Sequence, residues 1–297
     1  MTRKEFVTKA TVSLAESYSP GEAKALAVRI LSHFLGLSDY EFSVEPNVPI
    51  PKSGLDRLYN ALQELEASRP VQYVIGEETF MGRRFKVSES VLIPRPETEQ
   101  LCRIIIDDCR KQGYSTMKIV DACTGSGCIA YTLAAAFPKA EVLAFDIDED
   151  ALEVAKSQSV FLDEAERQPL TNIPEFFRAD ILAGPSDSQL AVEDADILVS
   201  NPPYVCESEK DFMSPNVLDY EPELALFVPD NDPLRFYKAL AVWAAGILNP
   251  GGKCYFEINE AYGSKIRRLY EEKGFSNVEI LQDFRGKDRF VYFEKWF

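Results

Sequence analysis

Residues 118–127 read Lys-Ile-Val-Asp-Ala-Cys-Thr-Gly-Ser-Gly, and this stretch decides the fold class. Ile119 and Val120 predict a buried strand, and the glycines that follow predict a tight turn. An apolar run from Cys128 to Phe137 then predicts a helix. A strand that turns through glycines into a helix is typical of the ligand-binding edge of an α/β sheet.

Strands and helices continue to alternate along the chain, and they predict a mostly parallel sheet covered by helices. Seven strands are expected, at residues 118–121, 140–146, 175–179, 194–200, 253–258, 278–281 and 290–293. One helix is expected to end near residue 110, and others to span residues 128–137, 149–161, 234–248 and 264–273. The last two strands are close together in the sequence, so we expect a hairpin at one edge of the sheet.

The first 75 residues have a helical pattern and are predicted to form a small domain of their own. Ser19 is a favoured residue for capping a helix, and Pro20 suits the first helical position. One buried helix face is marked by Leu55, Leu58, Leu62 and Leu65. We interpret these leucines as the core of a helical bundle that recognises a partner. Residues 76–92 predict a β-hairpin linker, and residues 93–297 the sheet domain.

The composition is that of a globular protein in a reducing compartment. Six cysteines form no C-x-x-C pair, so we expect free thiols, no metal site and a cytoplasmic location. No apolar run reaches the roughly 18–20 residues that cross a bilayer. The formal net charge of −16 argues against nucleic-acid binding, because phosphates require a positive field. A basic protein partner suits this charge better, and we expect the chain itself to be a monomer.

The glycine loop and the acid after the next strand predict a nucleoside-bearing cofactor. Asp146 follows the strand at the position from which a carboxylate can accept hydrogen bonds from a ribose. Gly125 and Gly127 also fit a dinucleotide fingerprint, which leaves NAD open at this point. Asp121 favours S-adenosylmethionine (AdoMet), because a carboxylate repels a pyrophosphate and attracts the ammonium of a methionine moiety.

A second acidic position follows the third strand of the sheet. Asp180 can accept a hydrogen bond from an adenine amino group, with Ile181 against the face of the ring. The alternative is an aspartate that caps a turn. Both interpretations remain open from the sequence.

The tetrapeptide Asn201-Pro202-Pro203-Tyr204 follows the fourth strand and is the most specific feature of the chain. The prolines stiffen the backbone and remove two N–H donors. The Asn201 side-chain oxygen and the Pro202 carbonyl can then accept both hydrogens of one planar NH₂ group, beside the ring of Tyr204. Two such acceptors stabilise the positive charge that develops as an amide or base nitrogen is methylated. We therefore expect Asn201, Pro202 and Tyr204 to be catalytic.

At these residues the chain resembles the PrmC (HemK) family of release factor glutamine methyltransferases. The resemblance covers nearly the whole chain. It is carried by Pro70-x-x-Tyr73-x-x-Gly76, Phe80-x-Gly82-x-x-Phe85, Ile93-Pro94-Arg95-Pro96-Glu97-Thr98-Glu99, the glycine loop, the tetrapeptide, Tyr220-Glu221-Pro222 and Asn249-Pro250-Gly251-Gly252.

The resemblance implies a class I AdoMet-dependent methyltransferase fold, with a Rossmann-like sheet preceded by a helical N-terminal domain and a hairpin. It implies N5-methylation of the glutamine in the Gly-Gly-Gln motif of class 1 peptide chain release factors, and an N-terminal domain that helps to hold the release factor. It assigns the cofactor site to Cys123, Thr124, Gly125, Ser126, Gly127, Asp146, Asp180, Ile181 and Asn201. Arg95, Glu99 and Pro203 are implied to flank the substrate pocket.

Cys123 departs from the family, which usually has glycine at this position. A Cβ atom is costly where a residue needs a positive φ, so we expect a negative φ at Cys123 and a slightly shifted loop.

Three other functions are compatible with parts of this pattern. An adenine N6 methyltransferase shares the tetrapeptide, but the negative charge and the lack of a target-recognition domain count against it. A NAD-dependent oxidoreductase explains the glycine loop and leaves the tetrapeptide without a role. A binding protein without turnover has no chemical need for Asn201, Pro202 and Tyr204.

Overall fold

The computed structural model describes residues 1–114, 116–158, 170–186 and 192–296. Its contacts divide the chain into two compact units. The first comprises Met1–Glu77 and Met213–Tyr220, and the second Glu78–Phe212 and Glu221–Phe297. Residues 213–220 lie within the range predicted for the sheet domain, whereas their contacts group them with the N-terminal helices.

The first unit is a bundle of helices. They are α1 (Arg3–Ser13), α2 (Pro20–Leu35), α3 (Asp39–Val44), α4 (Lys52–Glu66), α5 (Val71–Ile75) and α9 (Pro215–Leu218). Ser19 accepts a hydrogen bond from the backbone N–H of Glu22, and Pro20 occupies the first helical position, as predicted. On α4, Leu58, Leu62 and Leu65 are buried in the bundle, and Leu55 packs against them. The leucine face is therefore core, as interpreted.

The second unit is built on a seven-stranded sheet in the order β10-β11-β9-β6-β3-β4-β5. The strands are β3 (Lys118–Ala122), β4 (Glu141–Asp146), β5 (Glu175–Arg178), β6 (Ala195–Ser200), β9 (Leu248–Glu257), β10 (Ser276–Gln282) and β11 (Asp288–Glu294). β11 runs antiparallel to both of its neighbours, β9 and β10, whereas the pairs among β9, β6, β3, β4 and β5 are parallel. With β10 it forms the hairpin expected at one edge. The mostly parallel α/β fold is thereby confirmed.

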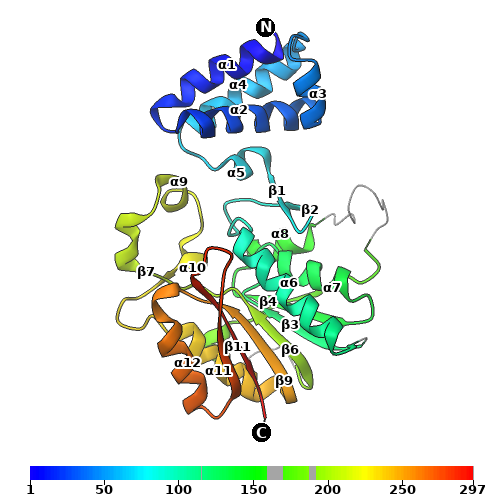
Figure 1. The fold of residues 1–297 in the computed structure, drawn as a ribbon, viewed down its shortest axis with the longest axis vertical. Helices are drawn as coiled ribbons and strands as arrows, with labels where there is room; N and C mark the ends of the chain where they lie inside the picture. The colour runs from blue at the N-terminus through cyan, green and yellow to red at the C-terminus, as the bar shows by residue number, and fades with distance from the viewer. Residues whose placement is uncertain (115, 159–169, 187–191, 297) are drawn as a thin grey trace. The chain divides into compact units, whose positions relative to one another are not determined.

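Helices cover both faces of this sheet, as the alternation predicts (Figure 1). They are α6 (Pro96–Lys111), α7 (Cys128–Ala136), α8 (Glu149–Lys156), α11 (Arg235–Ile247) and α12 (Gly263–Glu272). Alternate strand residues face α11 and α12 in one core and α6 and α7 in the other. The predicted helix 149–161 is observed as far as Lys156, and its last residues, 159–161, lie outside the described ranges.

A short hairpin precedes α6. It consists of β1 (Glu77–Phe80) and β2 (Arg83–Lys86), where the sequence predicts one. Phe80 and Phe85 are buried against α6 and α7. These two aromatic side chains attach the hairpin to the core of the second unit.

Short elements between β6 and α11 had no counterpart in the sequence analysis. β7 (Val205–Cys206) and β8 (Phe227–Val228) pair in parallel, and α10 (Glu223–Leu226) precedes β8. Within the described ranges no helix combines the length and hydropathy that a bilayer-spanning segment needs.

The parallel strands β3, β4, β6 and β9 end at one edge of the sheet. In doubly wound sheets this edge is where ligands bind. The glycine loop follows β3, Asp146 ends β4, and the tetrapeptide follows β6, so the fold gathers them there.

Candidate active site

A pocket opens at the carboxyl ends of the parallel strands. Most of the residues expected to bind the cofactor line it: Cys123, Thr124, Gly125, Ser126, Asp146, Asp180, Ile181 and Asn201. Ser90–Arg95 and the helix residue Thr98 close another side. The residues predicted to bind the cofactor are therefore mostly gathered at one pocket, and the structure adds the wall that precedes α6.

The two loop glycines serve different purposes. Gly125 has φ +53°, and a Cβ built on it would meet no atom within 4 Å. Gly127 has φ +79°, and its Cβ would lie 3.2 Å from Tyr131 and 3.3 Å from Ala155 and Phe176. Gly127 therefore allows the turn to pack against α7 and α8, while Gly125 leaves open space above the loop. That space suits the close approach of a ligand.

Asp146 ties the end of β4 to this loop. Its Oδ2 accepts a hydrogen bond from the backbone N–H of Gly125 at 2.9 Å, and its Oδ1 accepts one from Asp148 at 3.1 Å. Burial raises the pKa of Asp146 above its ordinary value, and these two hydrogen bonds oppose that rise. Each carboxylate oxygen keeps a lone pair, so the fixed carboxylate can still accept from a ribose diol.

Asp121 lies beneath the loop and is fully buried. Its Oδ2 accepts a hydrogen bond from the Thr124 hydroxyl at 2.6 Å, while Oδ1 has no hydrogen-bond partner among the described residues. Burial raises the pKa of Asp121 to about 7. Asp121 does not line the pocket, whereas Thr124 does. A buried carboxylate with one unpartnered oxygen fits a site that receives a cation.

The expectation of a negative φ at Cys123 is wrong, because its φ is +58°. β3 ends at Ala122, and the chain must turn at once for the Thr124 N–H to reach the carbonyl of Phe145 at 3.1 Å. The tertiary hydrogen bond therefore outweighs the steric cost of a Cβ atom in the left-handed region. The Cys123 side chain packs against the core beside α11.

Asp180 caps a turn, as one of the two interpretations expects, and its contact with an adenine stays a prediction. Its Oδ1 accepts from the backbone N–H of Leu182 at 2.8 Å and caps the short turn Ile181–Ala183. Asp180 and Ile181 also line the pocket. The carbonyl of Ile181 accepts from the indole of Trp243 at 2.8 Å, which holds this side of the pocket on α11.

The tetrapeptide enters the pocket only in part. Asn201 and Pro203 line it, and Pro202 and Tyr204 do not. The Asn201 side-chain Nδ2 donates to Thr98 Oγ1 at 3.2 Å, and the Tyr204 hydroxyl donates to Glu257 Oε1 at 2.9 Å. The structure therefore turns the Tyr204 hydroxyl toward a buried carboxylate.

Arg95 and Glu99, both expected beside the substrate, differ in position. Arg95 lines the pocket and forms an ion pair with the buried carboxylate of Glu221. Glu221 also accepts from the backbone N–H of Ile93 at 3.2 Å. Glu99 is absent from the lining, because its carboxylate accepts from the Met81 N–H at 2.7 Å and pairs with Arg103.

Sequence reasoning missed two polar residues next to Asn201. Thr98 belongs to the Ile93–Glu99 motif, but the sequence predicted no role for it, and it predicted none for Glu257. The available signal was a glutamate in the apolar strand Cys254-Tyr255-Phe256-Glu257-Ile258, because a charge in a buried strand requires a partner.

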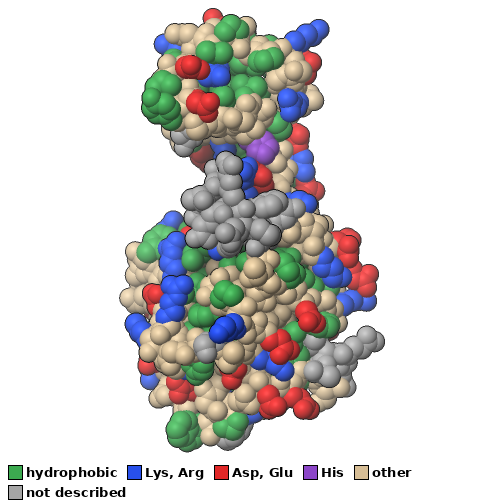
Figure 2. Space-filling model, turned by 90° about the vertical axis from the view of Figure 1, so that its right-hand side faces the viewer, with side chains coloured by type: hydrophobic (Ala, Val, Ile, Leu, Met, Phe, Trp, Pro, Cys, Tyr) green, Lys and Arg blue, Asp and Glu red, His purple; other side chains and the backbone are tan. Residues whose placement is uncertain are grey.

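Other features of the described chain bear on metals and charge. All six cysteines are free, and no three His, Cys, Asp or Glu side chains are grouped as a metal site requires, among the residues described. Figure 2 shows acidic and basic side chains interspersed over the face that it views. On this face neither positive nor negative side chains predominate.

Comparison with known proteins gives consistent similarities. Residues 114–257 match a family described as a methyltransferase domain, and residues 5–76 match the PrmC N-terminal domain. The release factor glutamine methyltransferase of Bacteroides thetaiotaomicron is 41% identical over 279 residues, which cover 94% of this chain and 95% of that protein. The protein of the same name from Flavobacterium psychrophilum is 37% identical over 292 residues, 98% of each chain. That from Chlorobaculum tepidum is 34% identical over 284 residues, 95% of this chain and 93% of its own.

Proposed function

Because the chain belongs to the release factor glutamine methyltransferase family, we propose that it methylates the side-chain nitrogen of a release factor glutamine. The acceptor is the N5 atom of the glutamine in the Gly-Gly-Gln motif of class 1 peptide chain release factors. The methyl donor is AdoMet, which supplies an electrophilic methyl group when bound. In this reading the protein acts in translation termination in the cytoplasm.

The arrangement around Asn201 is the observation that carries this proposal. Its Nδ2 donates to Thr98, so its Oδ1 is the atom left to accept a hydrogen from a substrate amide. An acceptor at this place increases the electron density on the amide nitrogen as the N–C bond forms. Asn201 lines the same pocket as Gly125 and Asp146, so substrate and cofactor groups can be held together.

The cofactor roles follow from the geometry of the loop. The open space above Gly125 receives the methionine moiety, and the fixed Asp146 carboxylate accepts from the ribose. Asp121, buried beneath the loop, attracts the ammonium through its charge, while Thr124, which donates to its Oδ2, lines the pocket. Asp180 and Ile181 hold the adenine end.

The partner surface is assigned by charge and by family. The net charge of −16 favours a basic protein over DNA or RNA. We assign recognition of the release factor to the N-terminal helices, and we expect a monomeric enzyme.

Methyl transfer from labelled AdoMet tests the proposal. The protein is incubated separately with a release factor, with its Gly-Gly-Gln variant carrying Gln→Ala, and with duplex DNA. We expect label on the unaltered release factor alone. Asn201→Ala should abolish it, whereas Asn231→Ala, at an exposed position outside the pocket lining, should not. Label on DNA with none on the release factor would refute the substrate assignment.

A further inference from the structure

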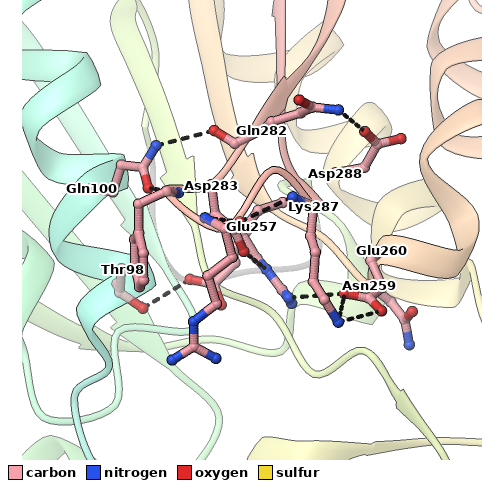
Figure 3. Close-up of polar contacts among 12 residues, drawn as sticks. Thr98, Gln100, Glu257, Asn259, Glu260, Gln282, Asp283, Lys287 and Asp288 are labelled. Atoms are coloured by element: carbon pink, nitrogen blue, oxygen red, sulfur yellow. Dashed lines mark hydrogen bonds and ion pairs between the residues drawn. The ribbon is translucent and has the colours of Figure 1, made fainter.

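A buried carboxylate connects both ends of the tetrapeptide. Glu257, at the end of β9, is 1% exposed. Its Oε2 accepts from the Thr98 hydroxyl at 2.8 Å, and its Oε1 accepts from the Tyr204 hydroxyl at 2.9 Å. Figure 3 shows Thr98 and Glu257 directed toward one another from α6 and β9. Thr98 in turn accepts from Asn201, so the contact with Asn201 is made through the threonine.

The direction of these hydrogen bonds follows from the number of protons. A threonine hydroxyl has one proton, and toward an ionised carboxylate it must donate that proton. Thr98 is then left with lone pairs only on the side of Asn201. The Asn201 amide must therefore turn its NH₂ group to Thr98 and its Oδ1 away from it. The opposite amide orientation would set Oδ1 against an oxygen that has no proton to give, and would leave a polar contact unmade.

Burial disfavours the ionised form of Glu257, and its polar surroundings partly offset that effect. Burial raises the pKa of Glu257, while the hydrogen bonds from Thr98 and Tyr204 and the positive charge of Arg289 oppose the rise. Arg289 is held by Asp283 and Glu260, each at 3.3 Å. Two carboxylates thus anchor a cation whose charge acts on Glu257.

We propose that Glu257, acting through Thr98, is a positioning residue that sets the orientation of the Asn201 amide. In this orientation Oδ1 is available to accept from the substrate NH₂. With the amide reversed, the NH₂ group of Asn201 would face the NH₂ group of the substrate, and no hydrogen bond would form. The same carboxylate holds Tyr204 and so fixes the far end of the tetrapeptide. This inference rests on the proposed function, since it assigns Asn201 Oδ1 as the acceptor for the substrate amide.

Two variants of Thr98 separate positioning from general packing. Thr98→Val keeps the shape of the side chain and removes the hydroxyl, and Thr98→Ser restores the hydroxyl. Steady-state methylation of a release factor should show kcat reduced by about 10²-fold in Thr98→Val, comparable to losing one oriented polar group at a reacting centre. Its KM for the release factor and its Kd for AdoMet should stay within about threefold. Thr98→Ser should recover most of kcat.

Glu257→Met gives a second route to the same test. It should lower kcat at least as far as Thr98→Val, and the double variant should lose no more than Glu257→Met alone, because both changes act through one contact chain. Equal losses in Thr98→Val and Thr98→Ser, or an unchanged kcat in Thr98→Val, would overturn the inference. So would additive losses in the double variant.

A readout that needs no activity distinguishes this inference from the proposed function. The ¹⁵N resonance of the Asn201 side-chain amide is identified by its disappearance in Asn201→Ala. It should shift in Thr98→Val and Glu257→Met and remain close to its original position in Thr98→Ser. If the unaltered protein fails to methylate a release factor while these shifts occur, the substrate assignment is wrong and the positioning contact stands. If the resonance stays unchanged in all three variants, the positioning contact is wrong.

Discussion

Asp146 accepts a hydrogen bond from the backbone N–H of Gly125 at 2.9 Å, so the acid that ends β4 holds the glycine loop that follows β3. One carboxylate thus shapes the loop and presents its remaining lone pairs to the pocket. Loop geometry and the proposed binding of ribose therefore depend on the same side chain.

Replacing Asp146 with alanine should weaken AdoMet binding by roughly 10–100-fold, since hydrogen bonds to a charged group contribute about 1.5–3 kcal/mol. Asp146→Asn should lose less, because an amide oxygen can still accept. Calorimetric titration with AdoMet measures both. Glu141→Gln, at the exposed opposite end of β4, is the matched control and should bind as the unaltered protein does. An unchanged Kd in Asp146→Ala would contradict the ribose assignment.

The affinity for AdoMet should depend on pH through Asp121. Its pKa of about 7 lies above the ordinary value of 3.8, so the group is neutral below pH 7 in the free protein. An ammonium favours the ionised form, so binding releases a proton and the Kd should fall as pH rises from 5.5 to 7. The slope is at most about tenfold per pH unit.

Asp121→Asn should flatten this profile, and Glu141→Gln should leave it intact. Titrations in two buffers of different ionisation enthalpy give the number of protons released. A steep profile that persists in Asp121→Asn would assign the titration to another group.

Cys123→Gly should bind AdoMet at least as tightly as the unaltered protein. Glycine adopts φ +58° without the Cβ penalty that cysteine bears there. Cys123→Val should weaken binding, because a β-branched side chain is still less compatible with this conformation. Calorimetry gives the affinities, and thermal unfolding shows whether the loop has altered the stability. A large loss of affinity in the glycine variant would show that the Cys123 side chain has a role beyond the turn.

Glu221→Gln should destabilise the second unit by about 1–3 kcal/mol, because it removes the anionic partner of Arg95 and weakens the acceptor for the Ile93 N–H. Glu223→Gln changes an exposed carboxylate two residues further along, and should stay within about 0.5 kcal/mol. Urea unfolding followed by circular dichroism compares the two. Equal effects would mean that the buried pair adds nothing beyond a surface contact.

The features that have a local sequence pattern could be predicted from the sequence. Most of the sheet strands contain an apolar run, and the glycine loop and Asp146 sit at strand ends. β9 is an exception at its start, because it begins at Leu248 and includes Pro250 and Gly251, whereas the sequence predicted a strand only from residue 253. Position at a strand end decides which edge of the sheet a residue reaches. This is why most of the residues proposed to bind the cofactor could be predicted to lie at one edge of the sheet.

The remaining features depend on contacts between distant parts of the chain. Thr98 meets Asn201 across 103 positions and Glu257 across 159, and no local pattern records which polar side chains will meet. The strands β7 and β8 have two residues each, too few to show a period. At Cys123 the local steric preference is for a negative φ. A hydrogen bond to the neighbouring strand overrides it, and φ is +58°.

The position of β11 has a consequence for how the protein is synthesised. β9 pairs with β6 on one side and with β11 on the other, and its residues Cys254–Phe256 are buried. β9 ends at Glu257, whereas β11 begins only at Asp288. A growing chain on the ribosome must therefore carry β9 with an open backbone edge until β11 emerges, and such edges recruit other chains. Substitutions in β11 should consequently reduce the yield of folded protein through aggregation during translation, while those molecules that fold keep an intact cofactor loop.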